Sequence, residues 1–123
     1  MVAQAHAATL IGIDAFPVVV EVDFRPAGDN TSNFILVGLP DKAVEESRVR
    51  VRSAITNSEL DFPAQFMIIC NLAPGDIRKE GPALDLPIAM TVLAGRNIVP
   101  MSELEDTILL GELGLDGRLR PID

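Results

Sequence analysis

The sequence predicts an α+β fold in which helices cover one face of a mixed sheet. Two observations lead to this class. The β-branched, apolar runs follow one another in groups with helical segments between them, rather than alternating strictly with helices. No glycine-rich turn joins a strand to a helix, which argues against a dinucleotide-binding α/β fold. With 123 residues, of which 48% are hydrophobic, the chain is expected to form a single domain over residues 1–123.

Three strands are expected in the first forty residues. Residues 7–13 and 17–24 are apolar, the second with alternating polarity, and the short link at 14–16 predicts a hairpin between them. Residues 25–33 are rich in Pro, Gly, Asp and Asn, which is typical of an exposed loop. Residues 34–39 predict a third strand that Pro40 stops.

The next segment predicts a helix followed by a strand. Asp41 can cap the helix by accepting hydrogen bonds from backbone N–H groups, and Asn57 and Ser58 end it. Residues 66–72 are continuously apolar, so this strand is expected to be buried on both faces.

A second helix and two strands complete the chain. Asp85 is expected to cap a helix that Gly95 ends, and its nearly uniform apolar composition predicts a central position. Residues 107–113 and 119–122 predict two strands, and Asp116-Gly117 between them is typical of a hairpin turn. Phe34, Leu36 and the Leu109–Leu113 run are expected in the core.

Composition excludes several kinds of protein. Eighteen acidic and ten basic residues give a net charge of −8, whereas sequence-independent nucleic-acid binding needs a basic surface. No apolar run is long enough for a transmembrane helix, and the N-terminus lacks the features of a signal peptide. The lone Cys70 indicates a reducing compartment, the cytoplasm. One His and one Cys, far apart, argue against a zinc site, and no P-loop, GxSxG or HExxH motif occurs.

The segment between the fourth strand and the second helix, NLAPGDIRKEGPALDLP, carries the main candidate site. Residues at the start of a helix can present free N–H groups to an anion or to a partner's carboxylate. The alternative is that the charges only solvate a turn that the glycines shape. The candidate residues of this loop are Asn71, Asp76, Arg78, Lys79, Glu80, Gly81 and Asp85.

Basic side chains on the first helix form a second candidate. Arg48 and Arg52 share one helix face, whereas Arg50 points elsewhere and has Glu46 as an (i, i+4) partner. Together with Arg78 and Lys79, Arg48 and Arg52 are candidates for one basic surface that contacts DNA or a protein partner. Neutralisation by the neighbouring acidic residues is the alternative.

Three separated motifs, VGLPDKAVEESRVRVRSAI, NLAPGDIRKEGPALDLPIA and LLGELGLDGRLRPI, resemble the N-terminal, ChlI-type domain of the ComM/YifB family of Mg-chelatase-like AAA+ ATPases. The resemblance runs from about Ala8 to Ile122. It implies the fold of ribosomal protein S5 domain 2, which also resembles the proteolytic domain of Lon. It further implies that the chain is an N-terminal fragment without a cofactor of its own. A motor domain that binds ATP and Mg²⁺ would follow it. The whole protein would assemble as a hexamer and act on DNA in natural transformation and branch migration.

The likeness to Lon leads to a negative expectation. Lon-type proteases carry a nucleophilic Ser in a Lys-Asp-Gly-Pro-Ser pattern, and the matching residues 79–83 here end in Ala83. A methyl group cannot attack a carbonyl, so we expect a non-proteolytic relative without catalytic residues.

Three functions therefore stay open at this stage. The first is an accessory domain that guides DNA or helps to assemble the ring with its own motor domain and neighbouring subunits. The second is a Lon-like peptidase that uses an unorthodox nucleophile among Ser47, Ser53, Ser58 and Ser102. The third is a protein-interaction module without direct DNA contact, whose negative charge steers a basic partner. None involves a membrane.

Overall fold

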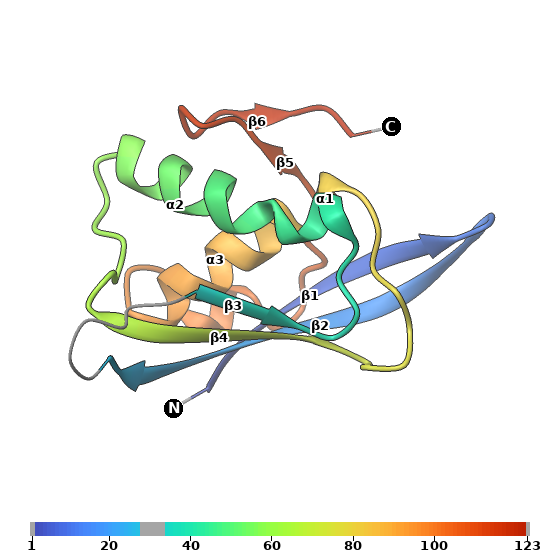
Figure 1. Ribbon diagram of the computed structural model, residues 1–123, viewed down its shortest axis with the longest axis horizontal. Coiled ribbons are helices and arrows are strands. Elements are labelled where there is room, and N and C mark those ends of the chain that lie inside the picture. The colour runs from blue at the N-terminus through green and yellow to red at the C-terminus, as the bar shows by residue number, and fades with distance from the viewer. Residues whose placement is uncertain (1, 28–33, 123) are drawn as a thin grey trace.

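A four-stranded mixed sheet forms one layer of the molecule (Figure 1). The computed structural model describes residues 2–27 and 34–122. The strand order is β1-β2-β4-β3, in which β3 runs parallel to β4 and the other neighbours are antiparallel. The strands are β1 (Val2–Ile11), β2 (Asp14–Pro26), β3 (Phe34–Val37) and β4 (Phe66–Ala73). The predicted mixed sheet is confirmed.

The predicted hairpin between the first two strands is also confirmed, although both strands are longer than expected. Its turn lies at Gly12-Ile13, and the predicted link at 14–16 belongs to β2 instead. Gly12 takes a positive φ of 63° at the first turn position, a conformation that glycine adopts without strain. The side chains of β1 alternate, and Ala3, Ala5 and Ala7 are buried toward the helices. Of the expected loop 25–33, residues 25 and 26 belong to β2 and residues 28–33 lie outside the described part.

The expectation that the fourth strand is buried on both faces is wrong. In β4, the buried Ile68, Cys70 and Leu72 alternate with partly exposed residues, because the helices of the described residues cover only one face of the sheet. Gly38, just after β3, passes so close to β4 that a Cβ would overlap the carbonyl oxygen of Leu72, and its φ is 105°.

The first predicted helix is divided in two. α1 (Lys42–Glu45) and α2 (Ser47–Asn57) are separated at Glu46, and α2 ends at Ser58 as expected. Asp41 caps α1 by accepting a hydrogen bond from the backbone N–H of Val44 at 2.8 Å, which confirms that prediction.

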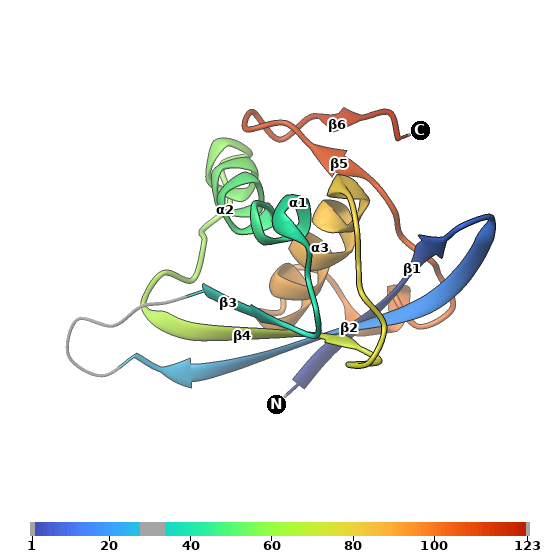
Figure 2. The ribbon, with the colours of Figure 1, turned by 45° about the vertical axis from the view of Figure 1, so that its right-hand side comes forward.

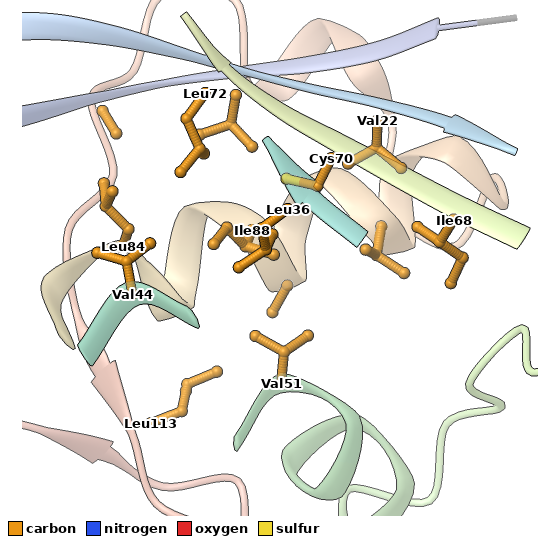
Figure 3. Close-up of a cluster of buried hydrophobic side chains, with 14 of the residues drawn as sticks. Val22, Leu36, Val44, Val51, Ile68, Cys70, Leu72, Leu84, Ile88 and Leu113 are labelled. Atoms are coloured by element: carbon orange, nitrogen blue, oxygen red, sulfur yellow. The ribbon is translucent and has the colours of Figure 1, made fainter. Parts of the chain in front are cut away.

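α3 (Asp85–Gly95) is the central helix that its composition predicts, and it lies between the sheet and the layer formed by α2 and the C-terminal hairpin (Figures 1 and 2). A short 3₁₀ turn, η1 (Pro82–Leu84), precedes it, and a second, η2 (Met101–Glu103), follows. The predicted capping role of Asp85 is wrong: Leu84 occupies the N-cap position, and the Asp85 side chain makes no capping hydrogen bond. The core side chains meet between the sheet and the helices, as Figure 3 shows for Val51, Ile68 and Ile88.

The last strands are shorter than predicted. β5 (Glu112–Leu113) and β6 (Leu119–Arg120) form the expected antiparallel hairpin around Asp116-Gly117. Within the rest of residues 107–113, Ile108 forms one parallel bridge with His6 of β1. The chain then leaves the sheet, and the carbonyl of Gly111 accepts a hydrogen bond from the N–H of Leu86 at the start of α3. As a result, Leu113 is buried but Leu110 is 37% exposed, so the run is only partly core. In the described residues, no helix is long and apolar enough to cross a membrane.

Candidate functional site

The loop between β4 and η1 is fastened to the segment that joins β3 to α1. The backbone N–H of Lys79 donates to the carbonyl of Leu39 at 3.0 Å, and its carbonyl accepts from the N–H of Asp41 at 2.9 Å. Gly81, with a φ of 82°, donates its N–H to Oδ2 of Asp41 at 3.2 Å. The carboxylate that caps α1 therefore also holds the end of this loop.

Lys79 does not lie on the surface, so its predicted place in a basic contact surface is wrong. Its side chain is fully buried, and Nζ donates to the carbonyl oxygen of Pro74. Desolvation lowers the pKa of Lys79, and the negative charge of Asp76 opposes this shift. The sequence shows a charged run between glycines, but it does not show that the loop folds back over this one side chain.

The three candidate arginines lie at two separate places. Arg48 donates from Nη1 to the carbonyl of Phe34, the first residue of β3, at 3.2 Å. Arg52, on the same helix face as predicted, lies over the ring of Phe62 at 5.2 Å. Arg78 belongs instead to the loop fastened just after the end of β3, and it lies 3.8 Å from the carboxylate of Glu80. Arg48 also pairs with a glutamate, Glu45, at 3.6 Å. The continuous basic surface is therefore not formed.

Of the other residues of the motif, Asn71 has a structural partner. Asn71 donates to Oε1 of Glu21 at 2.9 Å, across the β2–β4 pair, so it supports the sheet rather than the loop. Asp76 and Glu80 are exposed.

Asp85 is the centre of a buried polar cluster that the sequence analysis did not find. It is fully buried and accepts from Oγ of Ser47 at 2.5 Å and from Nε of Arg50 at 2.6 Å. The backbone N–H of Leu113 donates at 3.0 Å to Oδ2, the same carboxylate oxygen that accepts from Nε of Arg50. This cluster ties α2, α3 and β5 together.

The same cluster changes the interpretation of Arg50. Its predicted contact with Glu46 is present at 3.9 Å, but the hydrogen bond that Arg50 donates to Asp85 is the main reason that the pKa of Arg50 is raised. The only signal in the sequence is a lone carboxylate at the start of an otherwise apolar helix, and the partners are 35 positions apart, so no local pattern indicates the pairing.

A cavity of about 480 Å³ opens beside η1. Ala83, at the position that matches the Lon nucleophile, forms part of its wall together with Thr9 of β1 and Glu112 of β5. Neither lysine of the chain lines this cavity, and Ser47 is engaged with Asp85 elsewhere. The arrangement can bind a ligand, but the described part of its wall presents no Ser–Lys pair for covalent catalysis.

Residues 20–123 match the family model described as subunit ChlI of Mg-chelatase. The chain belongs to this family. The ChlI-family chain is 43% identical over 120 residues to "Uncharacterized protein YifB" of Salmonella typhimurium, covering 98% of this chain and 23% of that relative. It is 42% identical over 117 residues to the protein of the same name in Escherichia coli, covering 95% of this chain and 22% of the relative.

A relative with a functional name is "Competence protein ComM" of Haemophilus influenzae, which is 41% identical over 112 residues, or 91% of this chain. The ChlI-family chain spans 21% of that relative's length. The family resemblance expected from the three motifs is thus confirmed, and the chain corresponds to about a fifth of each of these proteins.

Proposed function

We propose that this ChlI-family domain is a non-catalytic accessory domain that makes protein contacts within a longer, Mg-chelatase-like AAA+ ATPase of the ComM/YifB type. The observation that carries this proposal is that the four candidate residues do not form one basic surface. Of the four residues expected to form that surface, Lys79 is buried, Arg48 and Arg78 lie beside glutamates, and Arg52 covers an aromatic ring. Because the chain also carries a net charge of −8, its surface suits proteins better than a phosphate backbone.

The remaining features of the proposal concern the longer protein. Residues 1–123 form its N-terminal domain, with the fold of ribosomal protein S5 domain 2 and of the Lon proteolytic domain. A motor domain binds ATP and Mg²⁺, and neighbouring subunits form a hexamer in the cytoplasm. The name of the Haemophilus influenzae relative, competence protein ComM, supports a role in competence, and hence in processing DNA, for the whole assembly.

The ring of the motor domain, rather than this domain, then contacts DNA. The separated positions of the candidate arginines support this assignment of the DNA contact. Ala83, whose methyl group cannot act as a nucleophile in the cavity wall, supports the non-catalytic role of the domain.

Binding to labelled single-stranded and forked DNA, measured by fluorescence anisotropy at about 50 and 200 mM salt, tests the proposal. The 123-residue chain is compared with its Arg48→Ala/Arg52→Ala/Arg78→Ala variant. We expect no binding of either protein at either salt concentration. Salt-sensitive binding that the triple variant loses would overturn the proposal and assign DNA contact to this domain.

A further inference from the structure

The cavity beside η1 lies where the polypeptide leaves the free edge of β1. Ile108 forms a parallel bridge with His6, and the N–H of Leu109 donates to the carbonyl of His6 at 2.8 Å. Three residues after Ile108, the N–H of Gly111 donates instead to the carbonyl of Ala83 at 2.8 Å. The two segments therefore diverge, and residues 8–10 of β1 line the opening between them.

The main chain of β1 presents hydrogen-bonding groups to this opening. The carbonyl of His6 points away from β2, since it accepts from Leu109. Because backbone groups alternate in direction along a strand, the N–H and C=O groups of Ala8 and Leu10 point to the same free edge. Residues 2–27 and 34–122 supply no hydrogen-bond partner for these groups on that edge.

A buried side chain in the same wall also lacks a partner. Thr9 is 4% exposed, and its Oγ1 makes no hydrogen bond with the described residues. A buried hydroxyl without a partner is costly, so native proteins rarely leave one unless something else satisfies it. This orphaned group lies between the two free main-chain positions of β1.

The charge of the cavity selects the kind of ligand. Asp41, Glu80 and Glu112 contribute carboxylates to its wall, and the described residues contribute no Lys, Arg or His. Glu112 forms no ion pair within 4 Å in this part of the chain, although its charge also acts on the cation of Arg50. Glu80 forms only a loose, exposed ion pair at 3.8 Å. Apolar side chains such as Leu110 and Ile122 complete the walls. The cleft thus suits a cationic side chain flanked by apolar groups, and its negative charge repels phosphate groups.

We propose that this cleft, the β1 cleft, binds an extended peptide segment with an Arg or Lys side chain, which adds to the free edge of β1 as a further strand. Pairing of an extended segment with an exposed sheet edge is a common mode of peptide recognition, in which main-chain hydrogen bonds give affinity and pockets give specificity. Here Ala8 and Leu10 supply the main-chain bonds, the Thr9 hydroxyl gains a partner, and Glu80 and Glu112 bind the cation. The inference rests on the proposed function, because it specifies one of the protein contacts that the domain makes.

The test uses two fluorescein-labelled peptides, acetylated Thr-Val-Thr-Arg-Thr-Val-Thr and its counterpart with Glu in place of Arg. Anisotropy is measured with the 123-residue chain at two salt concentrations. We expect the Arg peptide to bind at least about tenfold more tightly than the Glu peptide, with an advantage that falls at high salt. The Glu80→Gln/Glu112→Gln variant should lose the preference, whereas Glu103→Gln/Glu105→Gln, which changes the charge equally outside the cleft, should keep it.

Two further variants test the strand edge itself. Thr9→Val removes the hydroxyl with little change of shape, and Leu10→Pro removes one free N–H at a position that edge strands tolerate. Each should weaken binding of the Arg peptide severalfold while far-UV circular dichroism shows a folded protein. Should Leu10→Pro fail to fold, Thr9→Val still decides this point.

Equal affinity for the two peptides, or no binding of either up to about 1 mM, would overturn the inference. The DNA measurements separate this outcome from failure of the proposed function. A chain that binds neither peptide nor DNA refutes the β1 cleft alone, whereas salt-sensitive DNA binding refutes the protein-contact function as well.

Discussion

Removal of the Asp85 carboxylate should destabilise the domain strongly, because its donors would be left without an acceptor. Asp85 is fully buried and accepts from Ser47, from two nitrogens of Arg50 and from the N–H of Leu113. The Arg50 side chain is 19% exposed, so its charge would stay largely desolvated without a counter-charge. Breaking such a pair from one side costs about 3–5 kcal/mol, and the orphaned N–H adds about 1–3 kcal/mol.

For Asp85→Ala we therefore expect a loss of at least about 4 kcal/mol in the free energy of unfolding, a large part of the 5–15 kcal/mol typical of a domain. Urea unfolding followed by circular dichroism at 222 nm measures it, since the chain has no Trp or Tyr. Ser47→Ala, which removes one charge-assisted hydrogen bond, should cost about 2 kcal/mol and stays measurable if Asp85→Ala does not fold.

A double-mutant cycle separates the pair from the rest of the cluster. Arg50→Met should cost about 3 kcal/mol, and combining it with Asp85→Ala should add little, which gives a coupling energy of about 2–3 kcal/mol. Arg48→Met, which removes the exposed pair with Glu45, serves as the matched control and should cost at most about 0.5 kcal/mol. A loss below about 1 kcal/mol for Asp85→Ala, or additive effects of the two changes, would refute the reasoning.

Three further changes test other parts of the fold. Burial raises the pKa of the Cys70 thiol, so the thiol stays neutral in the native state, whereas it ionises in the unfolded chain above about pH 8.5. Compared with Cys70→Ala, the unaltered chain should therefore lose about 1.4 kcal/mol of unfolding free energy per pH unit above that pH, as measured by urea unfolding. Parallel plots of unfolding free energy against pH for the two proteins would contradict this. Desolvation lowers the pKa of Lys79, so its cation is disfavoured in the native state. Lys79→Met should therefore raise the free energy of unfolding at pH 7, and this gain should shrink as the pH rises toward about 10.4. A gain that is constant with pH would exclude this cause. Gly38→Ala should lower the free energy of unfolding by more than about 3 kcal/mol, measured by thermal unfolding, because its Cβ would overlap the carbonyl oxygen of Leu72. The matched change Gly75→Ala, at a position with open space, should alter it by at most about 0.5 kcal/mol. Equal effects of the two changes would show that the overlap relaxes.

Local sequence signals predicted the parts of the fold that depend on neighbouring residues. The alternation in β2, the cap at Asp41 and the hairpin turn at Asp116-Gly117 all lie within a few residues of the groups they organise. The uniform apolar character of residues 85–95 likewise predicted a central helix, because such a helix has no face that favours water.

Predictions failed where distant segments decide the outcome. The apolar run of β4 suggested two buried faces, but residues 2–27 and 34–122 cover only one face of the sheet, so alternate residues of β4 are partly exposed. Residues 107–111 looked like a strand, yet bonds to Ala83 and Leu86 divert the chain from the edge of β1.

The candidate site shows the same limit. Spacing on one helix correctly placed Arg48 and Arg52 on a shared face, but the loop that buries Lys79 and the pairing of Asp85 with Arg50 both depend on tertiary contacts. The position of a charged residue in a glycine-rich loop therefore does not predict its exposure until the path of that loop is known.

The burial of α3 between two layers has a consequence for the order in which the molecule opens. The backbone N–H groups of α3 lie between the sheet and the α2–hairpin layer, so they should exchange with deuterium only through global unfolding. The short β5–β6 hairpin, with β6 exposed, should exchange at lower opening energies. The bond from Leu113 to Asp85 sits at the boundary between these two regimes, and the protection of that single amide reports whether the outer layer detaches before the core melts.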